Sequence, residues 1–425
     1  MPCKDTPPRP LAFVRIAALA FSALCPLLMP AIAAAQEPIP LYTLQDLLAR
    51  ARRESPALAT SRAEQQSARA GILTARALPN PEISFDPGRL TPRRSDAIGG
   101  ASSAITISQP IESPWLREAR LNSANARVDL TVAQTGALES NLNAAIRDRF
   151  FDLLRLHSEQ LALQEDLQLT EQIRDRVAVR VRTGEAPRFD LLRADGEVAG
   201  VRKNLDSTVL RQRQARFALR QLVSPALEEN FEIELRADDA RLLTDTDYVA
   251  LKFAVVERNP DVLVAREAVQ GAERLIELER QQIVPQVTLR ATHERDSSAS
   301  LTRIGAQLTI PLLNRREGPI AEARANAERA RLALDQRRFE SDASFEAAWQ
   351  AYRAALSQVQ AIEGGILERS RRILAVAEAA YRLGERGILE YLDAQRQFRL
   401  VRNELLSARF DLQRARTDLE RLAGR

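Results

Sequence analysis

The chain of 425 residues contains 61 basic and 57 acidic residues, which gives a formal net charge of +4 at pH 7. Aromatic residues make up 5% of the chain and glycine is limited to 16 residues. This composition favours long helices that bury narrow apolar stripes over compact mixed cores. The net charge is small compared with the number of charged side chains. This indicates a solvated surface of mixed charge and excludes the basic surface of a nucleic-acid-binding protein.

Residues 1–35 have the features of a cleaved secretory signal. Three basic residues precede an apolar run that ends in three alanines, after which the sequence turns polar. Cys3 and Cys25 both lie in this segment, so the exported chain is predicted to have no disulfide and no thiol chemistry. After residue 35 no apolar run approaches the ~20 residues that a membrane helix requires. Membrane insertion would therefore have to occur as a β-barrel.

The rest of the sequence repeats itself at an interval of about 200 residues. Pro-Glu-Ile at 81–83 returns as Pro-Gln-Val at 285–287, 204 residues later, and the turn at Gly184 returns at Gly384, 200 residues later. The order of the motifs is kept, which predicts a duplicated unit. The predicted organisation is a first repeat in 36–225, a linker in 226–243 and a second repeat in 244–425.

Apolar residues alternate three and four positions apart along most of each repeat, which is typical of a left-handed coiled coil. From about Pro114 to Arg182 no proline intervenes, and a helix of that length would span ~100 Å. In the second repeat the same spacing predicts one continuous buried stripe, interrupted only at Arg369. The members of that stripe are Phe345, Ala348, Tyr352, Ala355, Val359, Ile362, Ile366, Ile373, Val376, Ala380 and Leu383.

Between the helices, each repeat contains two short segments in which apolar and polar residues alternate. This period of two predicts one β-hairpin at about 81–111, with a loop from Pro87 to Gly100, and a second hairpin at about 285–311. Strands of ~10 residues suit a membrane barrel. Two hairpins supply too few strands to close a barrel, and an open sheet edge cannot lie in lipid. Three chains would supply twelve strands, which makes a trimer the economical solution.

Taken together, these features resemble the outer-membrane efflux protein family typified by TolC, over about residues 41–424. The motifs that carry the resemblance are Glu54-Ser55-Pro56-Ala57-Leu58, Arg258-Asn259-Pro260, the strand entries at Pro81 and Pro285, Leu308–Leu312, Arg182–Glu185 and Arg382–Glu385. The resemblance implies a mainly α fold with a small β part, in which a homotrimer forms a 12-stranded outer-membrane β-barrel in lipid and a periplasmic α-helical tunnel. The mature length is similar to that of the shorter members, such as those of heavy-metal-resistance pumps.

The resemblance also implies a function. The trimer would be the passive exit duct of a tripartite efflux or secretion system, opened when a periplasmic adaptor (membrane fusion) protein and an inner-membrane pump of RND or ABC type dock on it. Glycine-closed turns end the long helices, and in the family these turns are the tips that the adaptor contacts. The residues at these positions are Thr183, Gly184, Glu185, Leu383, Gly384 and Glu385.

Two further sets of residues match the family's periplasmic gate. Glu390 and Asp393 lie one helical turn apart on one face, where a trimer would stack two acidic rings that favour cations over anions. The alternative is that these two acids simply lie on a solvated helix face. Asp190, Tyr381 and Arg386 stand where the family locks its closed tip, and an Asp190–Arg386 ion pair would be chemically sensible.

No catalytic, cofactor or metal site is expected. His157 and His293 are the only histidines, and neither has a cysteine or a second histidine at ligand spacing. Phosphate-binding loops, nucleophile elbows and metalloprotease helices are absent from the sequence. Two alternatives to a channel remain. A periplasmic adaptor would have one helical hairpin flanked by β-rich domains, and a structural coiled coil would leave the amphipathic hairpins without a purpose.

Overall fold

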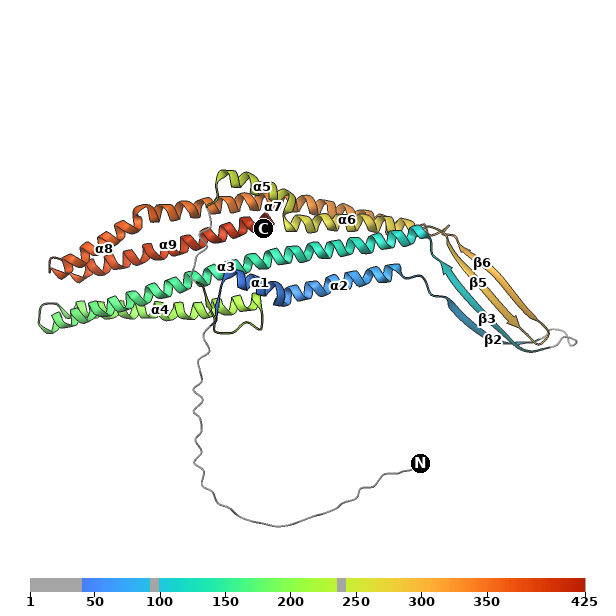
Figure 1. Cartoon of the computed structure of the whole chain (residues 1–425), viewed down its shortest axis with the longest axis horizontal. Helices are drawn as coiled ribbons and strands as arrows, with labels where there is room; N and C mark the ends of the chain where they lie inside the picture. The colour runs from blue at the N-terminus through green and yellow to red at the C-terminus, as the bar shows by residue number, and fades with distance from the viewer. Residues whose placement is uncertain (1–39, 92–98, 235–241, 425) are drawn as a thin grey trace, which may run out of the picture. The chain divides into compact units, whose positions relative to one another are not determined.

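The computed structural model describes residues 40–91, 99–234 and 242–424. The predicted signal (1–35) lies outside the described residues, as do parts of the predicted linker (235–241) and of the predicted first hairpin loop (92–98). Pro40–Arg425 forms one compact unit of long helices with a four-stranded sheet (Figure 1). Within the described ranges, no helix is long and apolar enough to cross a membrane.

The order of two helices, two long strands and then long helices occurs twice along the described chain, and the first set also contains two short strands. The first set is β1 (Leu41–Tyr42), α1 (Leu44–Glu54), α2 (Pro56–Arg76), β2 (Glu82–Leu90), β3 (Gly100–Ile111), α3 (Pro114–Arg182), α4 (Arg188–Val223) and β4 (Glu232–Ile233). The second set is α5 (Asp245–Arg258), α6 (Pro260–Gln281), β5 (Gln286–Arg295), β6 (Ser300–Thr309), α7 (Glu317–Ala361), a π-helical turn η1 (Ile362–Ile366), α8 (Leu367–Arg382) and α9 (Ile388–Leu422). The predicted class, mainly α with a small β part in a duplicated unit, is confirmed.

The helices α2 and α6 begin at corresponding motifs. Pro56 and Pro260 occupy the first turn of these helices, where a missing N–H breaks no helical hydrogen bond. The side-chain oxygen of Asn259 accepts hydrogen bonds from the N–H groups of Asp261 (3.0 Å) and Val262 (3.1 Å). Its Nδ2 donates to the carbonyl of Leu422 (3.0 Å), so this cap also ties the start of α6 to the end of α9.

The four long strands form one antiparallel sheet in the order β2-β3-β5-β6. Because β3 pairs with β5, the hairpins of the two repeats join, and β2 and β6 are left as edges. The prediction of a loop from Pro87 was wrong: β2 continues to Leu90, with Pro87 opposite Ser103. Proline is accommodated there because β2 is an edge strand.

The sheet has one apolar and one polar face. The apolar row of cross-strand neighbours is Ile83, Ile107, Ala291 and Ile304, and the adjacent polar row is Ser84, Thr106, Thr292 and Arg303. No described part of the chain covers the apolar face, where Ile304 is 86% exposed. The predicted alternation is therefore present in both hairpins, and its apolar side points away from the chain's own core.

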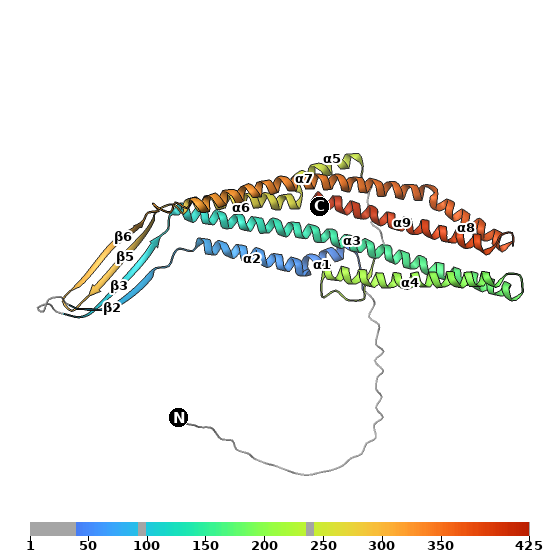
Figure 2. The ribbon, with the colours of Figure 1, turned by 180° about the vertical axis from the view of Figure 1, so that it is seen from behind.

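The helices pack side by side in a fixed lateral order. At the sheet end this order is α2, α3, α6, α7, and at the opposite end it is α4, α3, α9, α8 (Figures 1 and 2). Here α3 contacts α4 on one side and α9 on the other, while α8 contacts α9. The helix α3 runs unbroken through both ends and connects them.

In the second repeat the buried stripe changes phase at η1. Up to Ile362 the buried residues follow the predicted stripe, but beyond it the buried residues are Ser370 and Tyr381. The predicted member Ala380 is half-buried. The large predicted members from Ile366 onward lie on another face, between 45% and 74% exposed: Ile366, Ile373, Val376 and Leu383. That part of the prediction was wrong because a π turn holds one more residue than an α turn. One extra residue rotates all following side chains by about 100°.

The duplication identifies this extra residue as an insertion. Along α3 and α7, before η1, buried residues in equivalent places are 199 positions apart, as are Ile146 and Phe345. After η1 the interval is 200 positions, as between Thr170 and Ser370. Inside the π turn Gly365 has φ 154°, a backbone angle that side chains rarely adopt. Between Ile362 and Ser370 the second repeat therefore contains one more residue than the first does between Leu163 and Thr170, and η1 accommodates it.

Candidate functional site

Two glycine-closed turns end α3 and α8. Gly184 has φ 81° and Gly384 has φ 76°, the left-handed conformation that glycine adopts without steric cost. The N–H of Glu185 donates to the carbonyl of Arg180 (2.8 Å), and the N–H of Glu385 donates to the carbonyl of Ala380 (3.0 Å). These are the hydrogen bonds of a Schellman motif. The next helix starts four residues after each glycine, so the two repeats end in equivalent helical hairpins.

The predicted adaptor-contact residues are all exposed at these two turns. They are Thr183, Gly184, Glu185, Leu383, Gly384 and Glu385. Leu383, the residue directly before Gly384, has a large apolar side chain that is 74% exposed. Contact with an adaptor remains a prediction for these positions.

Tyr381, a predicted lock residue, lies in an aromatic core just inside the turns. Its ring stacks on that of Tyr391, with centroids 5.7 Å apart and planes 14° from parallel. The guanidinium of Arg180 lies 5.6 Å from the centroid of the Tyr381 ring. Ile173 and Val177 of α3 complete the cluster, which joins the two helical hairpins. Burial raises the pKa of Tyr391 to about 12, so this phenol stays neutral at physiological pH.

The predicted gate acids are exposed, and each has an arginine nearby that is three or four residues away in the sequence. The side chains of Glu390 and Asp393 are 50% and 60% exposed. The carboxylate of Glu390 lies 4.0 Å from Arg386, and that of Asp393 lies 3.5 Å from Arg396. Both arginines reduce the negative field of these acids. Any cation preference from this pair would therefore be weaker than that of two unpaired acids.

The predicted Asp190–Arg386 pair is not formed within one chain: in the described part of the structure, Arg386 pairs with Glu390 instead. Asp190 is half-buried in the first turn of α4, where the helix dipole favours a negative charge. A lock between these two residues remains a prediction for an assembled form.

Buried ion pairs between the two repeats were not predicted. Asp166 on α3 pairs with Arg402 on α9. Glu197 on α4 is only 10% exposed and accepts hydrogen bonds from Arg396 (2.7 Å) and from Arg399. Burial alone would raise the pKa of Glu197, but the two arginines outweigh it and lower the pKa. These pairs join residues that are between 199 and 236 positions apart in sequence, and spacing within one repeat cannot reveal them.

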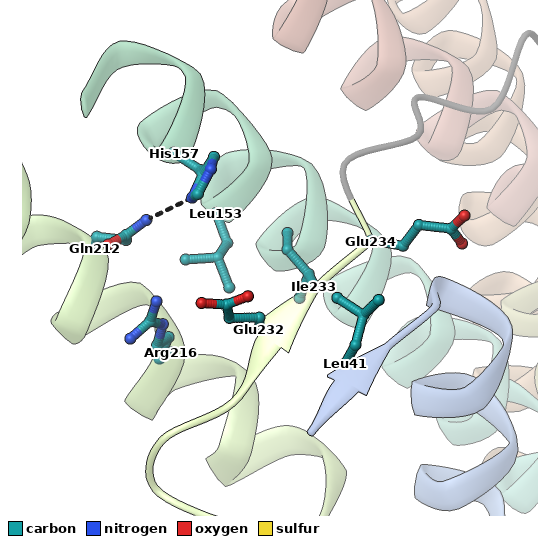
Figure 3. Close-up of a pocket in the computed structure, with 8 residues that line it drawn as sticks. All are labelled: Leu41, Leu153, His157, Gln212, Arg216, Glu232, Ile233 and Glu234. Atoms are coloured by element: carbon teal, nitrogen blue, oxygen red, sulfur yellow. Dashed lines mark hydrogen bonds between the residues drawn. The ribbon is translucent and has the colours of Figure 1, made fainter. Parts of the chain in front are cut away.

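A pocket of about 270 Å³ lies beside the small parallel sheet of β1 and β4 (Figure 3). Its lining residues are Leu41, Leu153, His157, Gln212, Arg216, Glu232, Ile233 and Glu234. The side chains of His157 and Gln212 are hydrogen-bonded to each other (Nδ1 to Nε2, 3.2 Å). Across the described ranges, no three His, Cys, Asp or Glu side chains are grouped so as to hold a metal ion.

Comparison with known proteins places these features in one family. The model of the outer membrane efflux protein family matches residues 47–224 and 254–425. The chain is 23% identical over 387 residues to the cobalt-zinc-cadmium resistance protein CzcC of Cupriavidus metallidurans, covering 90% of each chain. It is 21% identical over 345 residues to the pyoverdine export outer membrane protein OpmQ of Pseudomonas aeruginosa, covering 78% of this chain and 71% of that protein.

A solved structure shows the same fold. The structure is similar to the CmeC outer membrane channel of Campylobacter jejuni, with a TM-score of 0.76 and 14% identity over 90% of this chain and 85% of that chain. The family comprises channels of the outer membrane, which is not a class of enzymes. Its match also sets aside the alternatives of a periplasmic adaptor and a structural coiled coil. The chain belongs to the outer membrane efflux protein family.

Proposed function

We propose that three copies of this chain form the exit duct of a tripartite export system. The observation that carries the proposal is the four-stranded sheet: among the described residues its edges β2 and β6 have no partner strand, and its apolar face is exposed. Three such sheets, joined β6 to β2, would close a barrel of twelve strands without a free edge. The apolar face then meets lipid and the polar face lines the duct.

The long helices continue this wall into the periplasm and end at the two glycine-closed turns. The duct supplies no energy. An inner-membrane pump of RND or ABC type drives the cargo, and a periplasmic adaptor docks at the turns and shifts the closed tip toward the open state. Glu390 and Asp393 give the tip a preference for cations.

Divalent metal ions are the cargo class that the comparisons favour. The cobalt-zinc-cadmium resistance relative CzcC is matched over 90% of both chains, a larger share than the pyoverdine-export relative OpmQ. A duct with a weak cation preference suits such cargo, since the ion needs to pass the tip without being held there. Selection of the cargo itself belongs to the pump.

The proposal is tested by location and native mass. We would fractionate the membranes of cells that express the chain, extract it in mild detergent and weigh the complex by native mass spectrometry. A complex of three chains in the outer-membrane fraction is the expected result. Monomers in the soluble periplasmic fraction would overturn the proposal. A variant with Ile304→Asp on the apolar face serves as a control, because a charge facing lipid should lower its yield in the membrane.

A further inference from the structure

The apolar face of the four-stranded sheet ends in basic residues near the hairpin turns. Pairing is regular along all four strands, so alternate residues of each strand keep to one face. From the row of Ile304 toward the turns, the next row on this face is Phe85, Ile105, His293 and Thr302. The row after it is Pro87, Ser103, Arg295 and Ser300, and Arg89 lies one row further out. We call Arg89 and Arg295 the basic rim.

The charged residues of the sheet are sorted between its two faces. All three acids of its strands lie on the polar face: Glu82, Asp86 and Glu294. Among the described residues of the four strands, the apolar face carries no acid, and neither arginine of the basic rim has an acidic partner in the described structure. On the polar face, in contrast, Arg303 pairs with Glu294. The basic rim therefore holds positive charge that the described chain does not neutralise.

The basic rim lies beyond the apolar rows by about the thickness of the hydrocarbon layer. Eight positions of β3 separate Ile111, at the helix end of the sheet, from Ser103 in the row of Arg295, a path of about 26 Å at ~3.3 Å per residue. The apolar band of a membrane barrel is about 25 Å tall. Strand tilt shortens the height, but Leu312 and Leu313, which are 68% and 102% exposed, extend the apolar surface at the helix end. Arg295 is therefore placed near the membrane surface, where a charge facing lipid costs little.

Polar groups that suit a phosphate surround Arg295 on this face. In the row below it, Nδ1 of His293 and Oγ1 of Thr302 are hydrogen-bonded to each other (2.9 Å). In its own row, Ser103 and Ser300 stand on either side of it and add two hydroxyl groups. Guanidinium and hydroxyl donors are the groups that bind phosphate oxygens, and arginine binds them with two parallel hydrogen bonds.

We infer that the basic rim binds the phosphate groups of anionic lipids in the outer leaflet of the outer membrane. This inference rests on the proposed function, in which the long helices extend into the periplasm. The hairpin turns lie at the opposite end of the sheet (Figure 1), so the rim is at the outer surface. Arg89 and Arg295 are two strands and one row apart, on the order of 12 Å. A headgroup with two phosphates can therefore contact both.

The occupant is a lipid and not the cargo, because the rim continues the face that meets lipid while the polar face lines the duct. Basic residues at a membrane surface attract anionic headgroups. In a ring of three chains the rim repeats three times around the barrel. Bound headgroups would then hold the barrel at one depth in the membrane.

Lipid binding to the purified trimer tests the rim directly. We would add diphosphoryl lipid A, a glycolipid with two phosphates, to the full trimer in mild detergent and count the bound lipids by native mass spectrometry. Arg89→Gln combined with Arg295→Gln should weaken binding about ten-fold or more, because it removes both charged contacts. The matched control combines Arg290→Gln with Arg303→Gln, which removes two arginines of the polar face. It should bind lipid A as tightly as the native chain.

The native chain supplies a second test that needs no variant to fold. Lipid A without its phosphates should bind about ten-fold more weakly than the diphosphoryl form, and inorganic phosphate in excess should not displace the intact lipid. Equal affinity for the two lipids would overturn the inference. So would unchanged binding by the variant that lacks both rim arginines. Displacement by inorganic phosphate would also overturn it, because the rim would then bind free anions.

Native mass separates a failure of this inference from a failure of the proposed function. A trimer that does not prefer the phosphorylated lipid would refute the role of the rim and leave the channel standing. A chain that is not a trimer in the outer membrane would refute the proposed function together with the rim.

Discussion

The carboxylate of Asp166 on α3 pairs with the guanidinium of Arg402 on α9, across 236 positions of sequence. The two side chains are 8% and 19% exposed, so water screens this pair very little. The pair lies next to the hydrogen bond between Gln395 and Thr170. Together these contacts fasten the helical hairpin of the first repeat to that of the second.

Replacing Asp166 with alanine should destabilise the protein strongly, because it leaves a buried guanidinium without its counterion. The expected loss is about 3 kcal/mol, measured by thermal or denaturant unfolding in detergent with the helical circular dichroism signal. The exposed pair of Arg202 and Glu171 is the matched control. Glu171→Ala should cost less than ~1 kcal/mol. Equal losses for the two variants would contradict the role given to burial.

Gly365 should not tolerate a side chain, whereas its neighbour should. At φ 154° an alanine is strained, so Gly365→Ala is expected to lower the free energy of unfolding by about 1 kcal/mol or more. Gly364→Ala, in the same turn, should be neutral or slightly stabilising because alanine is the better helix former. The comparison of melting temperatures checks this. An unchanged melting temperature for Gly365→Ala would show that the π turn does not depend on the backbone conformation of this glycine.

Stability should fall as the pH rises through the titration of Asp148. Burial, and the nearby carboxylate of Asp418, raise the pKa of Asp148 to about 6. Between pH 4 and pH 6 the folded chain therefore binds a proton that the unfolded chain has released, and each rise in pH costs stability. Because Asp148 is only partly buried, we expect a total loss of about 1–2 kcal/mol.

Unfolding midpoints measured from pH 4 to pH 8 test this dependence. Asp148→Asn should remove it, and Asp418→Asn should shift it to lower pH by removing the neighbouring negative charge. If the unfolding midpoint of the Asp148→Asn variant depended on pH as strongly as that of the native chain, the titration would belong to another group.

Removing both gate acids should reduce the cation preference of the channel. The double variant Glu390→Ala and Asp393→Ala is expected to lower the ratio of cation to anion permeability in planar bilayers by about two- to five-fold. The change is moderate because Arg386 and Arg396 already offset part of the acidic charge. A matched control is the double variant Asp335→Ala and Glu368→Ala, exposed acids that also pair with arginines three or four residues away. Equal permeability ratios in the native chain and the gate variant would refute the gate assignment.

Features encoded by short-range pattern could be predicted from the sequence. The proline that starts α2 returns at the start of α6, and the glycine that closes α3 returns at the end of α8. Each depends on backbone geometry that a single residue type satisfies. The partner of Glu390 could also be predicted from the sequence, because Arg386 precedes it by about one helical turn.

The phase of α8 and the ion pairs between the repeats could not be predicted in the same way. The spacing of apolar residues at intervals of three and four continues across η1. The sequence pattern alone therefore gives no sign that the helix contains an extra residue. The pair of Asp166 and Arg402 depends on which helices become neighbours, a property of the whole fold. The burial of the residues reveals the difference: the interval between equivalent buried residues changes from 199 to 200 positions at η1.

The π turn also bears on how the two halves of a duplicated gene can diverge. An inserted codon in the middle of a coiled coil would ordinarily disturb every contact downstream of it. Here the turn at Ile362–Ile366 accommodates the insertion locally, and the glycine turns at the ends of α3 and α8 keep the same geometry. The residues of α8 can then differ in orientation from the stripe that precedes η1, while the glycine turns that end both hairpins keep one geometry.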